Sequence, residues 1–246
     1  MRKISYLLLA TLFLGTTGCD TLNEVAKAVV ESSTGGVPTS LEMSGGLKEA
    51  LNNGVRFAVN TLGKEGGYYN DPLVKIPFPQ EAEFAAKALR DIGLGKLVDD
   101  FEKLINEGAE EGAKEALGIF GNAVKAMTFA DVQSILLGDN KAATRYFQEK
   151  TTDQLFQTFS PKIETALDKV NATKVWSDIT TKYNAIPFTK KKVETDLVRY
   201  ATEKAMQGLF MKVAEEELKI RQNVSARGTS LLQKVFGYAD QQKAGN

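Results

Sequence analysis

Apolar residues recur every three to four positions along most of this chain, and that period constrains its fold more than any other feature. Leu47, Leu51, Val55, Ala58 and Leu62 fall on one face of a helix. No alternating pattern typical of a strand reaches a convincing length. The sequence therefore predicts an all-α fold, with a single domain of about eight to ten helices over residues 46–237. In the second half of the chain, separate helices are predicted at 140–149, 152–159, 161–170, 174–184, 194–222 and 229–236.

Residues 63–79 interrupt the helical pattern with three glycines and three prolines, which predicts an extended loop. Farther along, small side chains follow at helical spacing and would let another helix approach closely. Charged residues interleaved with these small ones argue against a pair of membrane helices. Whether the partner helix belongs to the same chain or to a second copy stays open. The stripe consists of Gly108, Ala109, Gly112, Ala113 and Ala116.

Thirteen phenylalanines supply most of the aromatic side chains. Many fall on apolar helix faces, where large aromatic side chains are usually core residues. Thr128 and Asp131 fit a capping box at the start of a short helix that ends near Gly138. The phenylalanines expected to be buried are Phe120, Phe129, Phe147, Phe156, Phe159, Phe210 and Phe236.

The N-terminus has the organisation of a secretory signal. Two basic residues, Arg2 and Lys3, precede the apolar run Ile4–Leu14, which is shorter than the roughly 20 residues needed to span a bilayer as a helix. Small residues then lead to Cys19, the only cysteine. Residues 1–18 thus resemble a bacterial lipoprotein signal, although Thr16 stands where that pattern usually has leucine.

This resemblance implies that Cys19 is lipidated and holds the protein at a membrane. Residues 19–45 are rich in Ser, Thr and Gly toward their end, which predicts a flexible tether between the acylated N-terminus and the helical domain. We therefore expect a location in the cell envelope, facing the periplasm. Asp20, directly after Cys19, resembles the inner-membrane retention signal of some bacteria, but the choice between inner and outer membrane stays open. The alternative is a secreted protein with an incidental cysteine, but no Ala-x-Ala cleavage site directly follows the apolar run.

The composition excludes several classes of function. No histidine is present, which removes Ser-His-Asp and Cys-His catalysis, imidazole zinc sites and histidine-ligated haem. A single cysteine excludes an internal disulfide. Without Arg2 and Lys3, 29 basic side chains face 31 acidic ones, and this balance predicts no nucleic-acid partner. We predict no cofactor and no metal site.

Two polar clusters lie among the predicted helices, one in "ATRYFQEKT" and one in "AEEELKIRQNVSAR". Glu217 and Arg221 have the i,i+4 spacing of a helical ion pair. Our first interpretation is that both clusters form ion pairs that set the register between helices. The alternative is an anion-binding pocket made by the three arginines. The candidate residues are Arg145, Tyr146, Glu216, Arg221 and Arg227.

No catalytic residue is predicted. Acidic runs such as Asp99-Asp100 contain adjacent residues, which point about 100° apart on a helix and do not form the facing pair of a glycosidase. The segment "GLGK" at 93–96 lacks the spacing of a phosphate-binding loop and indicates a helix stop.

Several segments together resemble one family. The longest are "LRDIGLGKLVDDFE" (89–102), "MTFADVQSILLGDNKAATRYFQEKT" (127–151) and "YATEKAMQGLFMKVAEEELKIRQN" (200–223). They are similar to a bacterial envelope family known as domain-of-unknown-function family 4197, over nearly all of 46–237. That family tends to have Asn-Arg-Ala-Ala-Glu where this chain has Asn106-Glu107-Gly108-Ala109-Glu110. The resemblance implies a helical, exported, frequently lipid-anchored protein, and no particular activity.

These observations predict a lipid-anchored envelope protein that acts as an interaction or assembly module for a protein partner and is not an enzyme. The alternative is a carrier or sensor for a lipid or another apolar molecule, suggested by the phenylalanines and the stripe of small residues. Residues 238–246 are predicted to be a disordered tail.

Overall fold

The computed structural model describes residues 36–79, 83–91, 93, 95–169, 173–174, 176–177, 181, 184–185 and 196–244. The predicted signal peptide, Cys19 and most of the predicted tether lie outside the described residues, as does much of the predicted helix 174–184. The chain divides after Val37, and the elements below belong to the part from Pro38 onward. The regular elements of the described residues are all helices, which confirms the all-α class.

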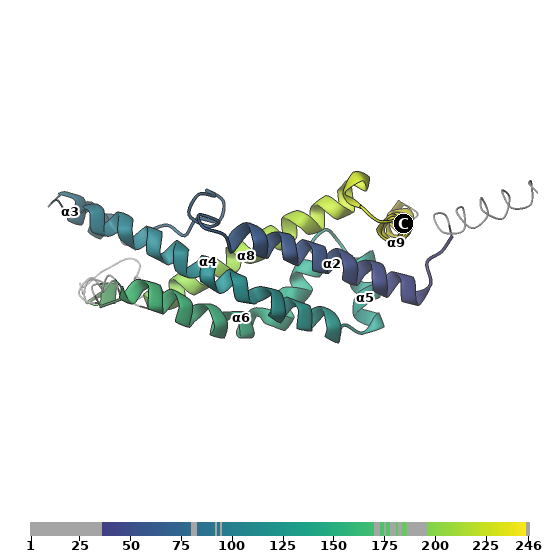
Figure 1. Cartoon of the computed structure of the whole chain (residues 1–246), viewed down its shortest axis with the longest axis horizontal. Coiled ribbons are helices and arrows are strands. Elements are labelled where there is room, and N and C mark those ends of the chain that lie inside the picture. The colour runs from purple at the N-terminus through teal and green to yellow at the C-terminus, as the bar shows by residue number, and fades with distance from the viewer. Residues whose placement is uncertain are drawn as a thin grey trace, which may run out of the picture. The chain divides into compact units, whose positions relative to one another are not determined.

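Most helices follow one another closely along the chain (Figure 1). The exceptions are the irregular segment after the first helix and residues 169–196, which are only partly described. Their bounds are α2 (Ser40–Leu62), α3 (Glu83–Asp91), α4 (Gly95–Ala126), α5 (Phe129–Leu137), α6 (Ala142–Asp168), α8 (Leu197–Gln222), the 3-10 turn η2 (Val224–Ala226) and α9 (Ser230–Ala244).

The described residues contain fewer helices than the eight to ten predicted, because three predicted helices between 140 and 170 form one, α6. Pro161 was expected to start a new helix but lies inside α6. Proline removes one backbone hydrogen bond and usually breaks a helix. Here the helix continues because Phe159 and Ile163, on either side of the proline, both pack against α4.

Four long helices form the body of the domain. Helix α4 lies between α2 and α6, and α8 contacts α6 and α2 (Figure 1). Their shared core is aromatic: the ring centroid of Phe120 on α4 lies 4.9 Å from that of Phe147 on α6 and 6.0 Å from that of Phe210 on α8. Edge-to-face pairs of this kind stabilise a core beyond the area that they bury.

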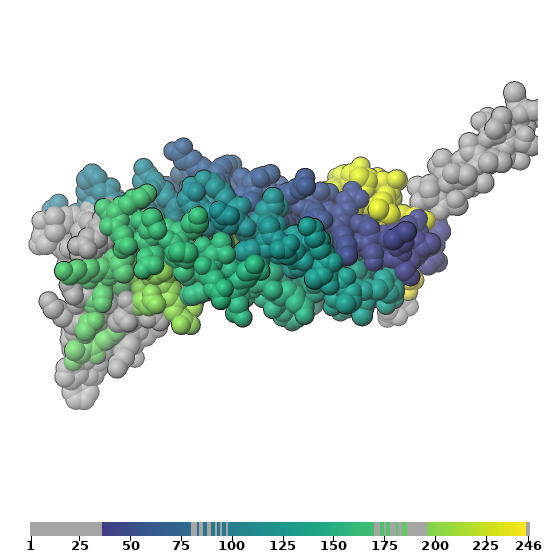
Figure 2. Space-filling model, turned by 60° about the horizontal axis from the view of Figure 1, so that its bottom comes forward, coloured from purple at the N-terminus to yellow at the C-terminus, as the bar shows by residue number. Residues whose placement is uncertain are grey.

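The stripe of small residues packs within the chain, against α6. A Cβ atom added at Gly108 would lie 2.8 Å from the Cα atom of Ile163, and one added at Gly112 would lie 2.6 Å from the ring of Phe159. Ala109, Ala113 and their neighbours on this face are fully buried. The stripe therefore lets α4 and α6 approach closely, and the space-filling view shows helices in close contact along the body (Figure 2).

The first helix begins earlier than expected. Helix α2 starts at Ser40, inside the segment predicted as tether, because Thr39 and Glu42 form a capping box. The hydroxyl group of Thr39 accepts from the backbone N–H of Glu42 at 3.2 Å, and the Glu42 carboxylate accepts from the Thr39 N–H at 2.7 Å. Gly46, the first residue of the predicted helical domain, lies inside this helix and is buried. It is a packing residue, since an added Cβ there would lie 2.8 Å from the side chain of Val235 on α9.

The last helix ends later than expected. Helix α9 runs to Ala244, through most of the segment predicted as a disordered tail. Val235, Phe236 and Ala239 on its inner face are buried. The apolar pattern fades after residue 237, but Ala239 continues it by one more turn.

A salt bridge joins α2 to α9 and gives a pH-dependent contribution to stability. The Lys234 amine lies 2.8 Å from the Glu42 carboxylate. That hydrogen bond, helped by the Thr39 cap, lowers the pKa of Glu42 from 4.5 to about 2. A carboxyl group whose pKa is lower in the folded than in the unfolded state stabilises the fold at pH values above its ordinary pKa. This stabilisation is lost as the pH falls toward the pKa of the folded state.

We therefore expect the advantage in melting temperature of the wild type over Glu42→Gln to shrink between pH 4.5 and pH 2. Thermal unfolding followed by circular dichroism would measure it. Glu164→Gln, at an exposed position on α6, is the control for general acid effects. A difference between wild type and Glu42→Gln that stays constant across this range would contradict the prediction.

Five of the seven phenylalanines expected to be buried are buried, and Phe156 is partly so. Phe129 is the exception: it starts α5 with 39% of its surface exposed. Among the described residues no helix is long and apolar enough to cross a membrane, and none of their Asp, Glu, His and Cys residues form a group of three or more that could hold a metal ion.

Candidate functional site

The second polar cluster contains a buried carboxylate that caps a helix. Glu217 on α8 accepts hydrogen bonds from the backbone N–H groups of Ala143 and Thr144, both at 2.9 Å, and from the Thr144 hydroxyl at 2.8 Å. These N–H groups belong to the first turn of α6 and have no partner within the helix. A negative charge there is also favoured by the helix dipole. Glu217 therefore fixes the start of α6 against α8.

Arg221, one turn along α8, caps a second helix. Its guanidinium group donates to the Glu217 carboxylate at 2.9 Å and to the backbone carbonyls of Ile135 and Leu136 at 2.7 and 3.2 Å. Those carbonyls end α5. The side chains of Glu217 and Arg221 are each only 5% exposed. The pair thus joins the end of α5 to the start of α6 across the turn between them.

Arg227 plays a similar part at the end of α8. Its guanidinium group donates to the backbone carbonyls of Ile220 and Arg221 at 3.0 and 2.8 Å and lies 2.7 Å from the Asp240 carboxylate. It also lies over the ring of Phe236, 5.7 Å from the centroid. Arg227 therefore closes α8 and ties it to α9.

The remaining candidates lie around this buried pair and not in it. Arg145 pairs with Asp139 at 3.0 Å, and both side chains are more than half exposed. Tyr146 donates its hydroxyl to the Ala123 carbonyl at 3.1 Å, and its pKa is raised by burial. Glu216 faces the other side of α8 and pairs with Lys219 at 3.2 Å. Arg221 and Arg227 bind acceptors on other helices, which fits the interpretation that they set helix register. The Arg145–Asp139 and Glu216–Lys219 pairs are local and do not join two helices.

A second polar site went unnoticed in the sequence. The loop at 63–79, named here the strap, lies against a row of polar side chains on α4 spaced one helical turn apart. In the middle of the row, the Asn106 amide accepts from the Ile76 N–H and donates to the Ile76 carbonyl, both at 2.9 Å. Glu102 accepts from the Phe78 N–H at 3.1 Å. Side chains here replace the backbone partners that an irregular segment lacks.

Glu110 completes the row. Its carboxylate accepts from the backbone N–H groups of Gly66 and Tyr68, both at 3.2 Å. Burial raises the pKa of Glu110, opposed by these hydrogen bonds. The Tyr68 side chain is fully buried, and its hydroxyl group donates a hydrogen bond to the Ala205 carbonyl oxygen on α8 at 2.8 Å. Asn106 and Glu110 are the outer members of the run quoted above for the family resemblance, and their i,i+4 spacing on a buried face was the available signal.

Asn106→Ala is expected to lower the free energy of unfolding by about 2–3 kcal/mol, because it leaves the buried N–H and carbonyl of Ile76 without partners. Urea denaturation followed by circular dichroism would measure the loss. Asn52→Ala removes an exposed amide that bonds only its own helix and should change stability by no more than about 0.5 kcal/mol. Equal effects of the two substitutions would show that the strap does not depend on Asn106.

Besides a groove of about 380 Å³ that includes Tyr146, two larger open grooves lie on the surface of the described domain. One, of about 600 Å³, is lined by acidic and basic side chains of α4 and α6 and includes Glu110. Because both Glu110 oxygens accept strap N–H groups, this carboxylate has a structural role. The other, of about 510 Å³, lies between α2, the end of α8, η2 and α9, and its main polar side chains are Asn53, Glu216, Lys219, Asn223, Ser225 and Thr229.

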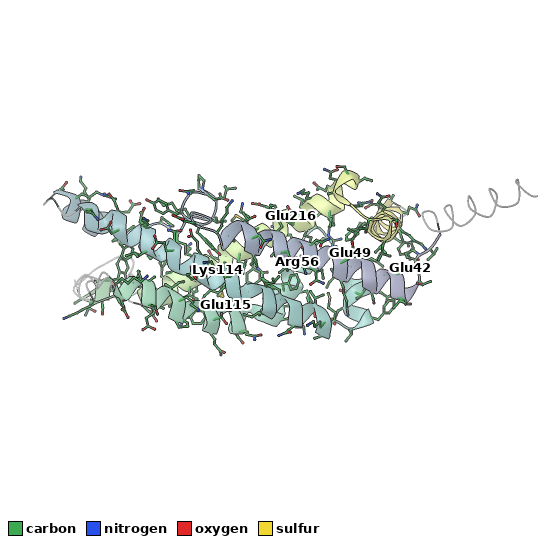
Figure 3. The ribbon with its side chains drawn as sticks, viewed as in Figure 1. Glu42, Glu49, Arg56, Lys114, Glu115 and Glu216 are labelled. Atoms are coloured by element: carbon green, nitrogen blue, oxygen red, sulfur yellow. The ribbon has the colours of Figure 1, made fainter. Side chains whose placement is uncertain are left out.

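The second groove combines polar walls with a small apolar floor. Ile220 and Leu232 form the floor. Lys219 lies 5.3 Å from the centroid of the exposed Phe57 ring. Glu216, labelled in Figure 3, lies against α2, where a Cβ atom added at Gly54 would be 3.6 Å from the Glu216 Cβ atom. By contrast, the apolar-lined cavity between α2, α8 and α9 holds only about 30 Å³, room for roughly one water molecule.

Comparison with known proteins places the chain in a family. The family model described as "Protein of unknown function (DUF4197)" matches residues 38–237. The chain belongs to this family. The match begins two residues before α2 and ends within α9, so the DUF4197 region covers the helical domain with the strap and both polar clusters. No curated protein and no solved structure matches the chain significantly.

Proposed function

We propose that this DUF4197 protein is an exported, lipid-anchored module of the bacterial cell envelope that binds a protein partner through its helical domain and performs no catalysis. The anchor is Cys19, and the domain faces the periplasm. The proposed partner surface is the 510 Å³ groove between α2, α8, η2 and α9.

The N-terminal sequence supports the location. Two basic residues, a short apolar run, four small residues and Cys19 follow one another in the order of a lipoprotein signal. A single acyl chain gives only weak membrane attachment, and stable anchoring needs more than one. A lipoprotein-type N-terminus supplies several acyl chains at one residue.

The proposal of a binding role rests on what the buried charged side chains contact. Glu110, Glu217, Arg221 and Arg227 are each bound to backbone groups or to one another. No buried side-chain nitrogen or oxygen of the described residues lacks a hydrogen-bond partner. A catalytic group has to be free to exchange a proton or attack a substrate, whereas these groups hold helix ends and the strap. The 510 Å³ groove between α2, α8, η2 and α9, by contrast, offers accessible polar side chains to the surface of a partner.

The alternative role, as carrier of an apolar molecule, has less support. Ligand pockets usually measure several hundred Å³ and are mostly apolar. Among the described residues, an apolar-lined cavity of about 30 Å³ is far too small, and the larger grooves have mixed polar and apolar linings.

Site-specific photocrosslinking in the intact cell envelope would test the proposal. A photoreactive amino acid at Asn53, inside the groove, is expected to give a discrete protein adduct, whereas the same amino acid at Glu164, exposed on α6, should not. Gly228→Lys adds a long charged side chain to the groove wall at a position where no atom lies within 4 Å of an added Cβ, and it should remove the adduct without changing protein abundance. Identical adduct patterns at Asn53 and Glu164 would rule out the groove as the partner surface.

Mass spectrometry of the protein extracted from membranes tests the anchor separately. We expect the first residue to be Cys19 carrying fatty acyl chains, and Cys19→Ser to release the protein from the membrane fraction. An unmodified Cys19 in membrane-derived protein would overturn the proposed anchoring.

A further inference from the structure

Helix α5 has an outer face without charge. Phe129, Gln133 and Leu137 follow one another at i,i+4 spacing, and Ala130 and Ser134 lie beside them. All five are exposed, Phe129 by 39% and Leu137 by 42%. This face is therefore neutral, although a quarter of the whole chain is charged, and surface helices usually place charged and polar residues on the outer face.

The one charged residue of α5 does not reach this face. Asp131 is bound at the helix start, where its carboxylate accepts from the backbone N–H and the hydroxyl of Thr128, both at 2.8 Å. The inner face, made by Val132, Ile135 and Leu136, is buried in the domain. Helix α5 therefore presents one apolar face to the core and one neutral face, with apolar side chains at both ends, to the outside.

Helix α5 lies at the end of the domain where the chain enters it (Figure 1). Figures 1 and 2 both show α5, α9 and the first half of α2 gathered at one end, while α3 and the start of α4 lie at the other. Leu41, in the first turn of α2, is 84% exposed. Glu42, labelled in Figure 3, marks the same end.

We propose that the outer face of α5, together with Leu41, lies on the lipid bilayer to which Cys19 is attached. This inference rests on the proposed anchoring at Cys19. We infer that a bilayer covers this face because the segment that follows Cys19 joins the domain at Pro38, just before α2. Attachment at that point holds this end near the lipid, so that even weak contacts of Phe129, Leu137 and Leu41 become effective.

The chemistry of the face fits the interfacial region of a bilayer. Phenylalanine and leucine side chains insert among the upper acyl chains, while Gln133 and Ser134 bind headgroups. The exposed Lys141 and the Arg145–Asp139 pair, just beyond Leu137, lie at the rim of this face, where charged groups remain in water. The polar groove described above contains none of these residues.

The test supplies the anchor chemically, so that it does not depend on acylation in the cell. The mature chain, residues 19–246 produced without acylation, is coupled through the thiol of Cys19, its only cysteine, to a maleimide phospholipid. The vesicles contain phosphatidylethanolamine and phosphatidylglycerol, with and without nitroxide-labelled lipid. An environment-sensitive fluorescent amino acid replaces Gln133, and in a matched control it replaces Lys103, an exposed residue near the start of α4.

We expect the probe at position 133 to show blue-shifted emission and to be quenched by the nitroxide lipid, and the probe at 103 to show neither. Phe129→Ser combined with Leu137→Ser should abolish both effects at 133 with no change in helical content. Equal quenching at the two positions would overturn the proposal. A blue shift at 133 without quenching by lipid would assign the face to a second copy of the chain, which also overturns it.

Discussion

Arg221→Ala is expected to lower the free energy of unfolding by about 3–5 kcal/mol, the range observed when one partner of a buried ion pair is removed. The substitution leaves the Glu217 carboxylate buried without its counter-ion. It also leaves the carbonyls of Ile135 and Leu136 at the end of α5 without donors. Urea denaturation of wild type and variant, followed by circular dichroism, measures the difference.

Arg145→Ala is the matched control, because this arginine also pairs with a carboxylate but does so on the surface. Exposed ion pairs contribute at most about 1 kcal/mol. If Arg221→Ala costs no more than Arg145→Ala, the Glu217–Arg221 pair does not hold the corner between α5 and α6, and the first interpretation of the polar clusters fails.

Gly108→Ala is expected to destabilise the domain by about 1–3 kcal/mol, although the same change stabilises most helices. The new methyl group would lie 2.8 Å from the Cα atom of Ile163, so α6 would have to move away from α4. Thermal and urea unfolding would both record the loss.

Gly118→Ala, on the same helix, is expected to increase the stability of the domain. No atom lies within 4 Å of a Cβ added at Gly118, and the residue is exposed. Replacing such a helical glycine by alanine typically stabilises a protein by about 0.4–1 kcal/mol. Two substitutions of the same kind on α4 should therefore change stability in opposite directions. A gain in stability at both positions would indicate that α4 does not approach α6 as closely as described.

The all-α class could be predicted because the 3.6-residue period depends only on which residues are apolar. The same reasoning divided α6 into three parts, since a local rule about Pro161 cannot register that Phe159 and Ile163 pack on one partner. Residues 40–45 were assigned to the tether for a related reason, although α2 begins at Ser40. Gly45, which lies in α2 beside the side chain of Leu231, has the same appearance in the sequence as a glycine chosen for flexibility.

The polar residues were harder to interpret. The i,i+4 spacing of Glu217 and Arg221 predicted their contact, which the structure confirms. Their backbone partners lie 73 to 86 positions away along the chain, beyond the reach of any local pattern. Asn106 and Glu110 were missed for the same reason, because the strap that they bind has no regular structure of its own. Phe129 was wrongly predicted to be buried, since an apolar position in a short helix does not reveal which face is covered.

The row on α4 has a consequence for hydrogen exchange. Backbone amides outside helices and sheets usually exchange quickly with solvent, yet those of Tyr68 and Ile76 in the strap are bonded to buried side chains of α4. Their exchange therefore requires either that the strap detaches or that α4 itself opens. Helix α4 contributes to the shared core, so opening it means opening the domain. The exchange rates of the slowest strap amides therefore report on the opening of the whole domain, although the strap itself has no secondary structure.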